Sequence, residues 1–212
     1  MAISDMRRQY SMGTLTEKDL TGHPVSLFKQ WLDEAIEANI PDPTAMTVAT
    51  VDASGQPSQR IVLLKDVSEQ GFTFFTNLGS RKAQELSDNP KVSLHFPWFF
   101  MERQVRICGT AHKLSLKQNA DYFFSRPKDS QLAAYASRQS QPVKTRELLM
   151  TQFSQLKAKF ADKQLPVPDF WGGYLIVPHQ IEFWQGGEHR LHDRFEYNLQ
   201  ADGNRTTTRL MP

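Results

Sequence analysis

Three groups of polar residues in this 212-residue sequence are candidates for binding phosphate. The first is an apolar run between Arg60 and Lys65, followed after one expected hairpin by Ser80, Arg81 and Lys82. Ser80 is a favourable N-cap, which puts Arg81 and Lys82 at a helix N-terminus, where free N–H groups attract anions. Cations there oppose the helix dipole, which favours a bound anion. The alternative, that these residues only protect an edge strand from aggregation, stays open.

The second group is Tyr122, Arg126 and Ser130, which are spaced four residues apart across an expected helix end. Two hydroxyls and a guanidinium form a donor set of the size that a phosphate group needs. On spacing alone, however, the simpler interpretation is an exposed helix terminus.

The third group lies in the segment Gly186-Gly187-Glu188-His189-Arg190-Leu191-His192-Asp193-Arg194-Phe195. If the strand expected here extends back through Arg190, then Arg190, His192 and Arg194 share one face. Alternation also puts Arg60 and Lys65 on opposite faces of their strand, unless a bulge intervenes, so that they could serve two different anions. Cations that share a face repel one another unless a negative or electron-rich group lies against them. The pattern therefore predicts a binding site at Arg190, His192 and Arg194.

Metal and nucleophile chemistry find little support in the sequence. His189 and His192 are three residues apart, so on a strand they face opposite sides, and no set of Cys or carboxylate ligands completes a metal site. Cys108 lies in an alternating apolar segment, and no Gly-x-Ser-x-Gly motif occurs. We interpret Cys108 as a small buried apolar residue of a protein from a reducing compartment. The remaining hypothesis is a phosphorylated cofactor that reacts with a phosphorylated substrate.

The elements that must position these residues follow from periodicity. Residues 1–24 lack a sustained pattern and predict a mobile N-terminal arm, which leads into a single domain over residues 25–212. A helix is expected from Ser26, which would be its N-cap, and Trp31, Trp98 and Trp171 are expected in the core or an interface. Further helices are expected at 81–87, 115–125, 131–137 and 144–161, the last of them amphipathic. Strands are expected at 45–51, 58–67, 72–76, 92–96, 104–114, 173–177, 180–184, 191–198 and 206–210.

This order favours a mainly β fold, in which an antiparallel sheet closes as a barrel with helices outside. Lys and Arg exceed Asp and Glu by only 25 to 23, which argues against nucleic acid as a partner. The N-terminus lacks the apolar core of a signal peptide, and no stretch approaches the roughly 20 apolar residues that span a bilayer. We expect a soluble, cytoplasmic protein without a membrane partner.

The residues above resemble the pyridoxine/pyridoxamine 5′-phosphate oxidase family over nearly the whole chain. The most specific segment is Ile181 to Phe195, which contains Phe-Trp-Gln-Gly-Gly-Glu-His-Arg-Leu-His-Asp-Arg-Phe. The other segments that carry the resemblance are Arg7–Tyr10, Asp42–Met46, Gln59–Lys65, Thr76–Lys82, Glu102–Val105, Ser125–Pro127 and Arg209–Pro212.

The resemblance implies an FMN-binding split barrel and a homodimer with two active sites at the subunit interface. It implies that FMN is bound by Arg60, Ile61, Val62, Leu63, Leu64, Lys65, Phe75, Thr76, Arg81, Lys82, Gln104, Gln139, Ser140, Trp184 and Arg194. Substrate would be bound by Arg7, Tyr10, Lys65, Tyr122, Arg126, Ser130, Arg190 and His192. Arg190 and His192 would be the catalytic residues, and the N-terminal arm would close over the substrate. Phe75 stands where many members have Tyr, which puts its side-chain role in doubt.

The reaction that the resemblance implies is oxidation of pyridoxine 5′-phosphate and pyridoxamine 5′-phosphate to pyridoxal 5′-phosphate. O₂ would be the electron acceptor, H₂O₂ would be a product, and the amine would also release ammonia. Two alternatives remain: a split-barrel flavin reductase, and a non-catalytic carrier of FMN or pyridoxal phosphate. A flavin reductase has no reason to carry Arg190, His192 and the Tyr122 group together.

Overall fold

One long strand, β7 (Trp171–Gln185), organises the fold. The computed structural model describes residues 2–212, in which nine strands form one antiparallel sheet with the order β2-β1-β5-β6-β7-β4-β3. β8 pairs with β7, and β9 with β8. The other strands are β1 (Ala45–Val51), β2 (Pro57–Leu63), β3 (Asp66–Ser68), β4 (Gly71–Asn77), β5 (Lys91–Trp98), β6 (Arg103–Lys113), β8 (Asp193–Leu199) and β9 (Arg205–Arg209). The expected antiparallel fold is confirmed.

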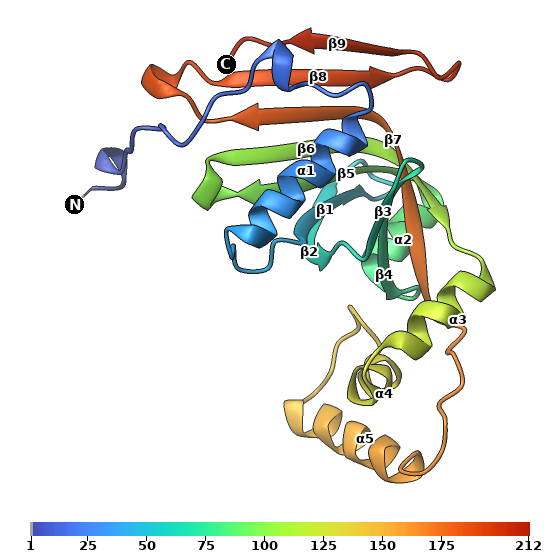
Figure 1. Ribbon diagram of the computed structural model, residues 1–212. Helices are drawn as coiled ribbons and strands as arrows, with labels where there is room; N and C mark the ends of the chain where they lie inside the picture. The colour runs from blue at the N-terminus through green and yellow to red at the C-terminus, as the bar shows by residue number, and fades with distance from the viewer. Residues whose placement is uncertain (1) are drawn as a thin grey trace.

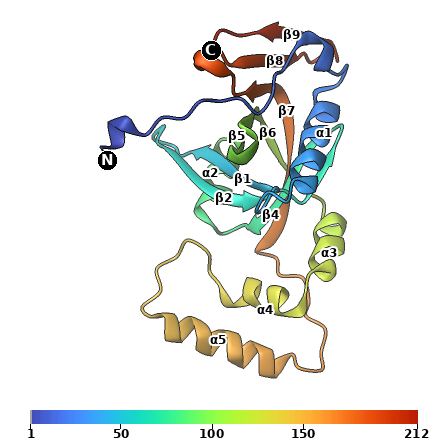
Figure 2. The ribbon, with the colours of Figure 1, turned by 60° about the vertical axis from the view of Figure 1, so that its left-hand side comes forward.

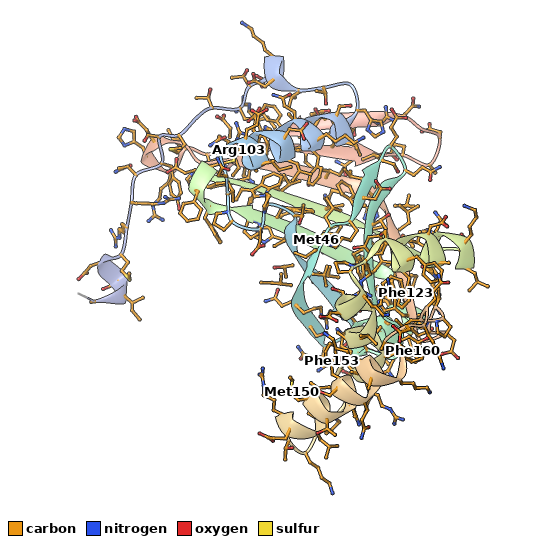
Figure 3. The ribbon with its side chains drawn as sticks, turned by 60° about the horizontal axis from the view of Figure 1, so that its bottom comes forward. Met46, Arg103, Phe123, Met150, Phe153 and Phe160 are labelled. Carbon is orange, nitrogen blue, oxygen red and sulfur yellow. The ribbon has the colours of Figure 1, made fainter. Side chains whose placement is uncertain are left out.

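The main core lies between the sheet and helix α1 (Pro24–Glu37). Alternate residues of β5 point inward, because side chains alternate across a strand. Phe28 of α1 packs edge-on against Phe72 and Phe96, with ring centroids 4.8 Å apart in both pairs. Met46 lies in this core beneath α1 (Figure 3). Trp31 and Trp98 are buried in the main core, and Trp171 is buried in a second cluster, which confirms their expected core positions.

The second hydrophobic cluster joins β7 to the helices α3 (Leu116–Ser125), α4 (Lys128–Ala136) and α5 (Arg146–Lys159). Phe123, Leu132, Leu165 and Trp171 are its buried residues, and Phe153 and Phe160 pack against them (Figure 3). The predicted helices are confirmed, and α3 begins with the expected capping box of Ser115 and Gln118. α5 is less firmly packed than its pattern suggested, because none of its described residues is buried.

Different secondary-structure elements lie at the two ends of the molecule. Helices α3 to α5 gather at one end of the sheet, whereas β8, β9 and the N-terminal segment lie at the opposite end (Figures 1 and 2). β7 runs between these two ends, and α2 (Arg81–Asp88) contacts β1 beside it. No helix within residues 2–212 is long and apolar enough to cross a membrane.

Several predicted boundaries were wrong. α1 begins before Ser26, because Pro24 suits a first helical position and His23 Nδ1 accepts the Val25 N–H at 3.2 Å. The strand expected over 58–67 is two strands, which are separated at Leu64 and Lys65.

The strands expected on either side of Pro178 are a single strand, β7. The pairing of β6 with β7 shifts register between Cys108 and Gly109, so that Gly109 lies opposite Pro178 and Cys108 opposite Gln180. This bulge accommodates a residue that cannot donate a backbone hydrogen bond. Cys108 lies at this bulge and is half-buried rather than buried.

Candidate functional site

A cavity of about 650 Å³ opens between β2, β4, α2 and the loop that follows α4. Eleven of the fifteen residues expected to bind a cofactor line this cavity, and a twelfth, Leu64, is buried. The eleven are Arg60, Ile61, Val62, Leu63, Lys65, Phe75, Thr76, Arg81, Lys82, Gln139 and Ser140. Arg60 and Lys65 line the same cavity, so the expectation of opposite faces was wrong. The reason is that β2 ends at Leu63 and the alternation ends with it.

Arg60 and Arg81 converge on one buried carboxylate, Glu85. Arg81 Nε donates to Glu85 Oε1 at 2.7 Å, and Arg60 Nη2 lies 3.5 Å from Glu85 Oε2. Thr50 and Ser58 also donate to this carboxylate. Burial alone would raise the pKa of Glu85, but hydrogen bonds from Thr50, Ser58 and Arg81 outweigh it and lower the pKa to about 2. Glu85 therefore stays ionised and holds both guanidinium groups at the cavity.

Lys82 is a buried cation of the cavity. Its side chain is buried, and Nζ donates to Thr76 Oγ1 at 2.9 Å and to Gln139 Oε1 at 2.8 Å. Both acceptors are neutral, and within residues 2–212 no carboxylate lies within ion-pair distance of Nζ. Burial and then the Arg60 charge lower the pKa of Lys82 to about 8. A buried ammonium in these surroundings is ready to bind an anion.

A stack of aromatic rings connects the cavity with α3. Phe75 lies 3.9 Å from Tyr122 and 5.2 Å from Trp171 between ring centroids, with interplanar angles of 16° and 9°. The side chain of Phe75 thus has a packing role without a hydroxyl. Arg126 lies over the Trp171 ring at 5.0 Å.

Arg126 also carries an unsatisfied donor. Its Nη1 is the one buried side-chain nitrogen or oxygen in residues 2–212 that lacks a hydrogen-bond partner. Burial lowers the pKa of Arg126 and raises that of Tyr122. The Tyr122 and Arg126 side chains are half-buried together rather than exposed at a helix terminus, and Ser130 is half-buried in the first turn of α4. An unpaired guanidinium nitrogen in a half-buried site is costly unless a ligand completes it.

The remaining candidates lie at the other end of β7. The His192 ring lies 4.7 Å from Trp184 and 5.3 Å from Tyr10 between centroids. Gln104 is opposite Trp184 in the β6–β7 pairing, and its Oε1 lies 3.2 Å from His95 Nε2. Arg7 is exposed on the N-terminal segment.

The strand face predicted for Arg190, His192 and Arg194 was wrong. Residues Glu188–Arg190 form a 3₁₀ turn in which His189 and Arg190 have φ of 54° and 65°, and β8 begins only at Asp193. Arg194 is instead paired with buried Glu182, at 3.0 and 3.1 Å, and donates to the Met211 carbonyl at 2.7 Å.

His192 is held as a neutral ring. Gly187 N–H donates to its Nδ1 at 3.1 Å, so the proton of the neutral ring resides on Nε2. Burial and then the neighbouring Arg190 charge lower the pKa of His192. Nε2 can therefore donate a hydrogen bond near neutral pH.

The two groups of candidates are far apart within one chain. Phe75 pairs with Gly173 near the start of β7, whereas Trp184 is close to its end. Eleven residues separate these positions, which corresponds to roughly 35 Å along an extended strand. One chain therefore carries two incomplete groups, near opposite ends of β7, whose course Figure 1 shows.

Known families and proteins match the segments of the chain that contain both groups. Residues 32–160 match the family model described as pyridoxamine 5′-phosphate oxidase, and residues 171–212 match the pyridoxine 5′-phosphate oxidase C-terminal dimerisation region. A protein of Alteromonas mediterranea named pyridoxine/pyridoxamine 5′-phosphate oxidase is 76% identical over 212 residues, which are 100% of both chains.

The chain belongs to the pyridoxamine 5′-phosphate oxidase family.

Further proteins are similar to the chain over most of its length. The protein of that name from Pseudoalteromonas translucida is 58% identical over 100% of both chains. The crystal structure of PhzG from Burkholderia lata, in complex with tetrahydrophenazine-1-carboxylic acid, has a TM-score of 0.88 and 30% identity, and covers 94% of this chain and 98% of its own. A related FMN-binding protein of Nostoc punctiforme, with a TM-score of 0.71 and 14% identity over 87% and 97% of the chains, supports the split-barrel fold.

Three glutamates with important contacts in this family member were not predicted. Glu85 holds Arg60 and Arg81, Glu182 holds Arg194, and Glu102 binds the N-terminal segment. Glu85 follows Arg81 by four residues, and this helical spacing could have indicated the pair. The contacts of Glu102 and Glu182 depend on the tertiary structure, so the local sequence does not indicate them.

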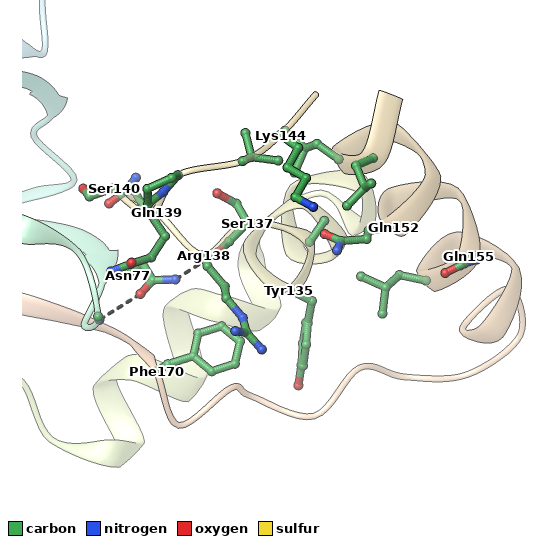
Figure 4. A pocket seen from close by; sticks show the side chains of 18 of the residues that line it. Asn77, Tyr135, Ser137, Arg138, Gln139, Ser140, Lys144, Gln152, Gln155 and Phe170 are labelled. Carbon is green, nitrogen blue, oxygen red and sulfur yellow. Dashed lines mark hydrogen bonds between the residues drawn. The ribbon is translucent and has the colours of Figure 1, made fainter. Parts of the chain in front are cut away.

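A second cavity, of about 1540 Å³, lies beside the first. It is formed by α4, α5 and the loop between them, and shares Gln139 and Ser140 with the smaller cavity (Figure 4). Asn77 fixes its inner edge, because its Nδ2 donates to the Ser137 carbonyl at 3.1 Å and its Oδ1 accepts the Gly79 N–H at 2.8 Å (Figure 4). Asn77 thus holds the loop that places Gln139 near Lys82.

Glu85 makes the stability of the protein sensitive to acid. Its folded pKa, about 2, lies below its ordinary 4.5, so its contribution is complete above pH 4.5 and is lost as the pH falls toward 2. We expect this contribution to be at most about 3 kcal/mol. Unfolding by urea between pH 7 and pH 3 should show a smaller loss of stability in Glu85→Gln than in the wild type. An equal loss in both proteins would contradict the assignment.

Proposed function

We propose that the chain oxidises pyridoxine 5′-phosphate and pyridoxamine 5′-phosphate to pyridoxal 5′-phosphate with FMN as cofactor and O₂ as electron acceptor. The observation that carries this proposal is a pair of cations without carboxylate partners, Lys82 and Arg126, near the Phe75 stack. Lys82 donates to Thr76, next to Phe75, and Arg126 lies over Trp171, which stacks on Phe75. Two such cations suit two phosphate groups, one on a cofactor and one on a substrate.

The smaller cavity has the donors that an FMN phosphate requires. Lys82 and Arg60 supply charge, and Glu85 holds Arg60 and Arg81 in place. Gln139 and Thr76 already accept hydrogen bonds from Lys82, so they would orient its ammonium toward the phosphate. We assign the FMN phosphate and ribityl chain to this cavity.

The substrate phosphate belongs to the group around Arg126. Arg126 Nη1 is buried and unpaired, and Tyr122 and Ser130 lie on the two helices that flank it, α3 and α4. Lys65 approaches from the cavity lining. This donor set would bind a phosphate ester and leave the pyridine ring free to lie against the flavin.

The complete site would be shared by two chains. Arg190, His192 and Trp184 lie at the end of β7 that is distant from Lys82 and Arg126, and residues 171–212 match a dimerisation region. A homodimer in which this end of one protomer covers the cavity of its partner would complete both sites. Gln104 and Arg194 would then reach the flavin of the partner's cavity.

The chemistry supplied by bound FMN is acceptance of a hydride from C4′ of the substrate, followed by reoxidation by O₂, which leaves as H₂O₂. Arg190 would position the substrate and stabilise the charge that develops in the transition state. His192 donates a hydrogen bond from Nε2 to the substrate. The alcohol yields the aldehyde directly, whereas the amine yields an imine, which water hydrolyses with release of ammonia.

The ionisation of Lys82 should make FMN binding dependent on pH. Its lowered pKa of about 8 means that the free protein loses this charge as the pH rises through 8, while the FMN phosphate stays dianionic. We expect the Kd for FMN to be flat from pH 6.5 to 7.5 and to rise by up to about tenfold per unit above pH 8. Titrations followed by flavin fluorescence at each pH measure this Kd. Lys82→Met should bind FMN more weakly and without this rise, and an unchanged pH profile in that variant would contradict the assignment.

Anaerobic mixing separates the proposed oxidase from a carrier or a reductase. Pyridoxamine 5′-phosphate added to the FMN-loaded protein without O₂ should bleach the visible absorbance of the flavin, and air should restore it. A carrier would show no bleaching. A flavin reductase would bleach only with a nicotinamide reductant, and either result would refute the proposed oxidase.

A further inference from the structure

The N-terminal segment is attached to the barrel through one buried carboxylate, that of Glu102. This residue ends the turn between β5 and β6, and only 4% of it is exposed. Its Oε2 accepts two backbone N–H groups of the segment, from Ser11 at 2.7 Å and from Met12 at 2.9 Å. The cation of Arg8 lies 3.8 Å from Oε1. Two charge-assisted hydrogen bonds to adjacent amides fix the path of the chain at this point.

The backbone of Glu102 is held as firmly as its side chain. Its carbonyl accepts the Gly186 N–H at 2.7 Å and Gln185 Nε2 at 3.3 Å, which ties the turn to the end of β7. Glu102 has φ 53° and ψ 37°, a left-handed conformation that glycine or asparagine adopts more readily than glutamate. The backbone conformation disfavours glutamate, so we infer that the hydrogen bonds of its side chain are the reason for a glutamate at this position.

Glu102 also determines where Tyr10 lies, because Tyr10 directly precedes the two bound amides. The Tyr10 ring lies edge-on to Trp184, at 5.8 Å between centroids, and to His192, at 5.3 Å. Its other support is Gly186, where an added Cβ would lie 2.7 Å from Tyr10 Cδ1 and 3.0 Å from Glu102 Cβ. Tyr10 therefore fits into a space between Glu102, Gly186 and the His192–Trp184 pair.

We infer that Glu102 is a positioning residue, which holds the N-terminal segment so that Tyr10 closes over a substrate bound at His192. This inference rests on the proposed function. Glu102 acts through Tyr10 and does not touch the substrate. Its loss should free the segment and weaken the retention of substrate, without changing the cavity that contains Lys82.

Steady-state kinetics of the FMN-saturated full-length protein provide the first test. Glu102→Ala should raise the KM for pyridoxamine 5′-phosphate about tenfold, change kcat less, and leave the Kd for FMN unchanged. Glu102→Gln keeps a neutral acceptor for the amides, and it should restrict the rise to about threefold. Asp19→Ala is the matched control, because Asp19 accepts the Thr16 N–H at 2.7 Å in the same segment, nine residues after Tyr10 in the sequence. A wild-type KM in Glu102→Ala would overturn the inference.

A double-mutant cycle distinguishes positioning from general stabilisation. If Glu102 acts through Tyr10, then Glu102→Ala should add nothing to the KM of Tyr10→Ala. Fully additive effects would overturn the inference, because they would show that Glu102 acts independently of Tyr10.

Amide hydrogen exchange tests the anchor without any turnover. The Ser11 and Met12 amides should exchange at least about tenfold faster in Glu102→Ala than in the wild type, while the core amides of β6 stay protected. This result in a protein without oxidase activity would retain the anchor and refute only the proposed function. Equal exchange in an active enzyme would refute the anchor alone.

Discussion

Replacing Arg126 with alanine is expected to raise the KM for pyridoxamine 5′-phosphate by a factor of about 100. The reason is that Arg126 Nη1 is buried without a partner, so a phosphate oxygen would satisfy a donor that is otherwise left without one. Arg126 also lies over Trp171, which fixes its guanidinium beside the Tyr122 and Phe75 stack. Steady-state oxidation rates over a range of substrate concentrations measure this effect.

The matched control for Arg126 is Arg146→Ala, which removes an exposed guanidinium at the start of α5. It should leave the KM unchanged. The Kd for FMN should be the same in both variants, because Arg126 lies outside the cavity that contains Lys82. The assignment of the substrate phosphate would be wrong if Arg126→Ala kept a normal KM for pyridoxamine 5′-phosphate. It would also be wrong if the variant raised the KM for unphosphorylated pyridoxamine by the same factor.

Mixed dimers of two inactive variants are expected to recover activity. Arg190→Ala should reduce kcat by about 100-fold or more while FMN stays bound, because Arg190 would stabilise charge in the transition state. Arg126→Ala impairs the other half of the same site. When both chains are expressed together, half of the dimers contain one chain of each kind, and one of their two sites then has no substitution. We expect about a quarter of the wild-type activity at a substrate concentration below the wild-type KM.

The control for complementation is each variant expressed alone, with tags that allow the mixed dimer to be purified. Pairing Arg126→Ala with Lys82→Met should give no recovery, because both residues lie at the same end of the chain and each site then carries a substitution. Failure of the first pair to recover would show that each chain builds its site alone, which would contradict the shared site.

Local chemistry explains which elements were predictable. The capping box of Ser115 and Gln118 starts α3, and the arginine before Pro127 ends it, because both signals act within a few residues. Pro178 gave a misleading signal, since the bulge at Cys108 on the neighbouring strand accommodates it. Long-range pairing decided that outcome, and no pattern within β7 indicates it.

In the candidate site too, the local sequence indicated some features, whereas others depend on long-range contacts. Lys82 and Arg81 were found from the helix start, yet only the tertiary structure shows that Arg81 is neutralised by Glu85 while Lys82 is not. The argument from alternation failed at Arg190 because residues 188–190 turn with positive φ, although the residues chosen there remain proposals through the family resemblance. The mobility of residues 1–24 stays a prediction. Glu102 attaches this segment to the barrel at Ser11 and Met12.

Oxygen consumption by the FMN-saturated protein is the most direct test of the central claim. Pyridoxamine 5′-phosphate and pyridoxine 5′-phosphate should each cause uptake of O₂ and formation of pyridoxal 5′-phosphate, whereas unphosphorylated pyridoxamine at the same concentration should cause almost none. Uptake restricted to the phosphate esters is the result that we predict. No uptake by a protein that retains its flavin, or equal uptake with and without the phosphate, would contradict an oxidase that holds its substrate through Arg126.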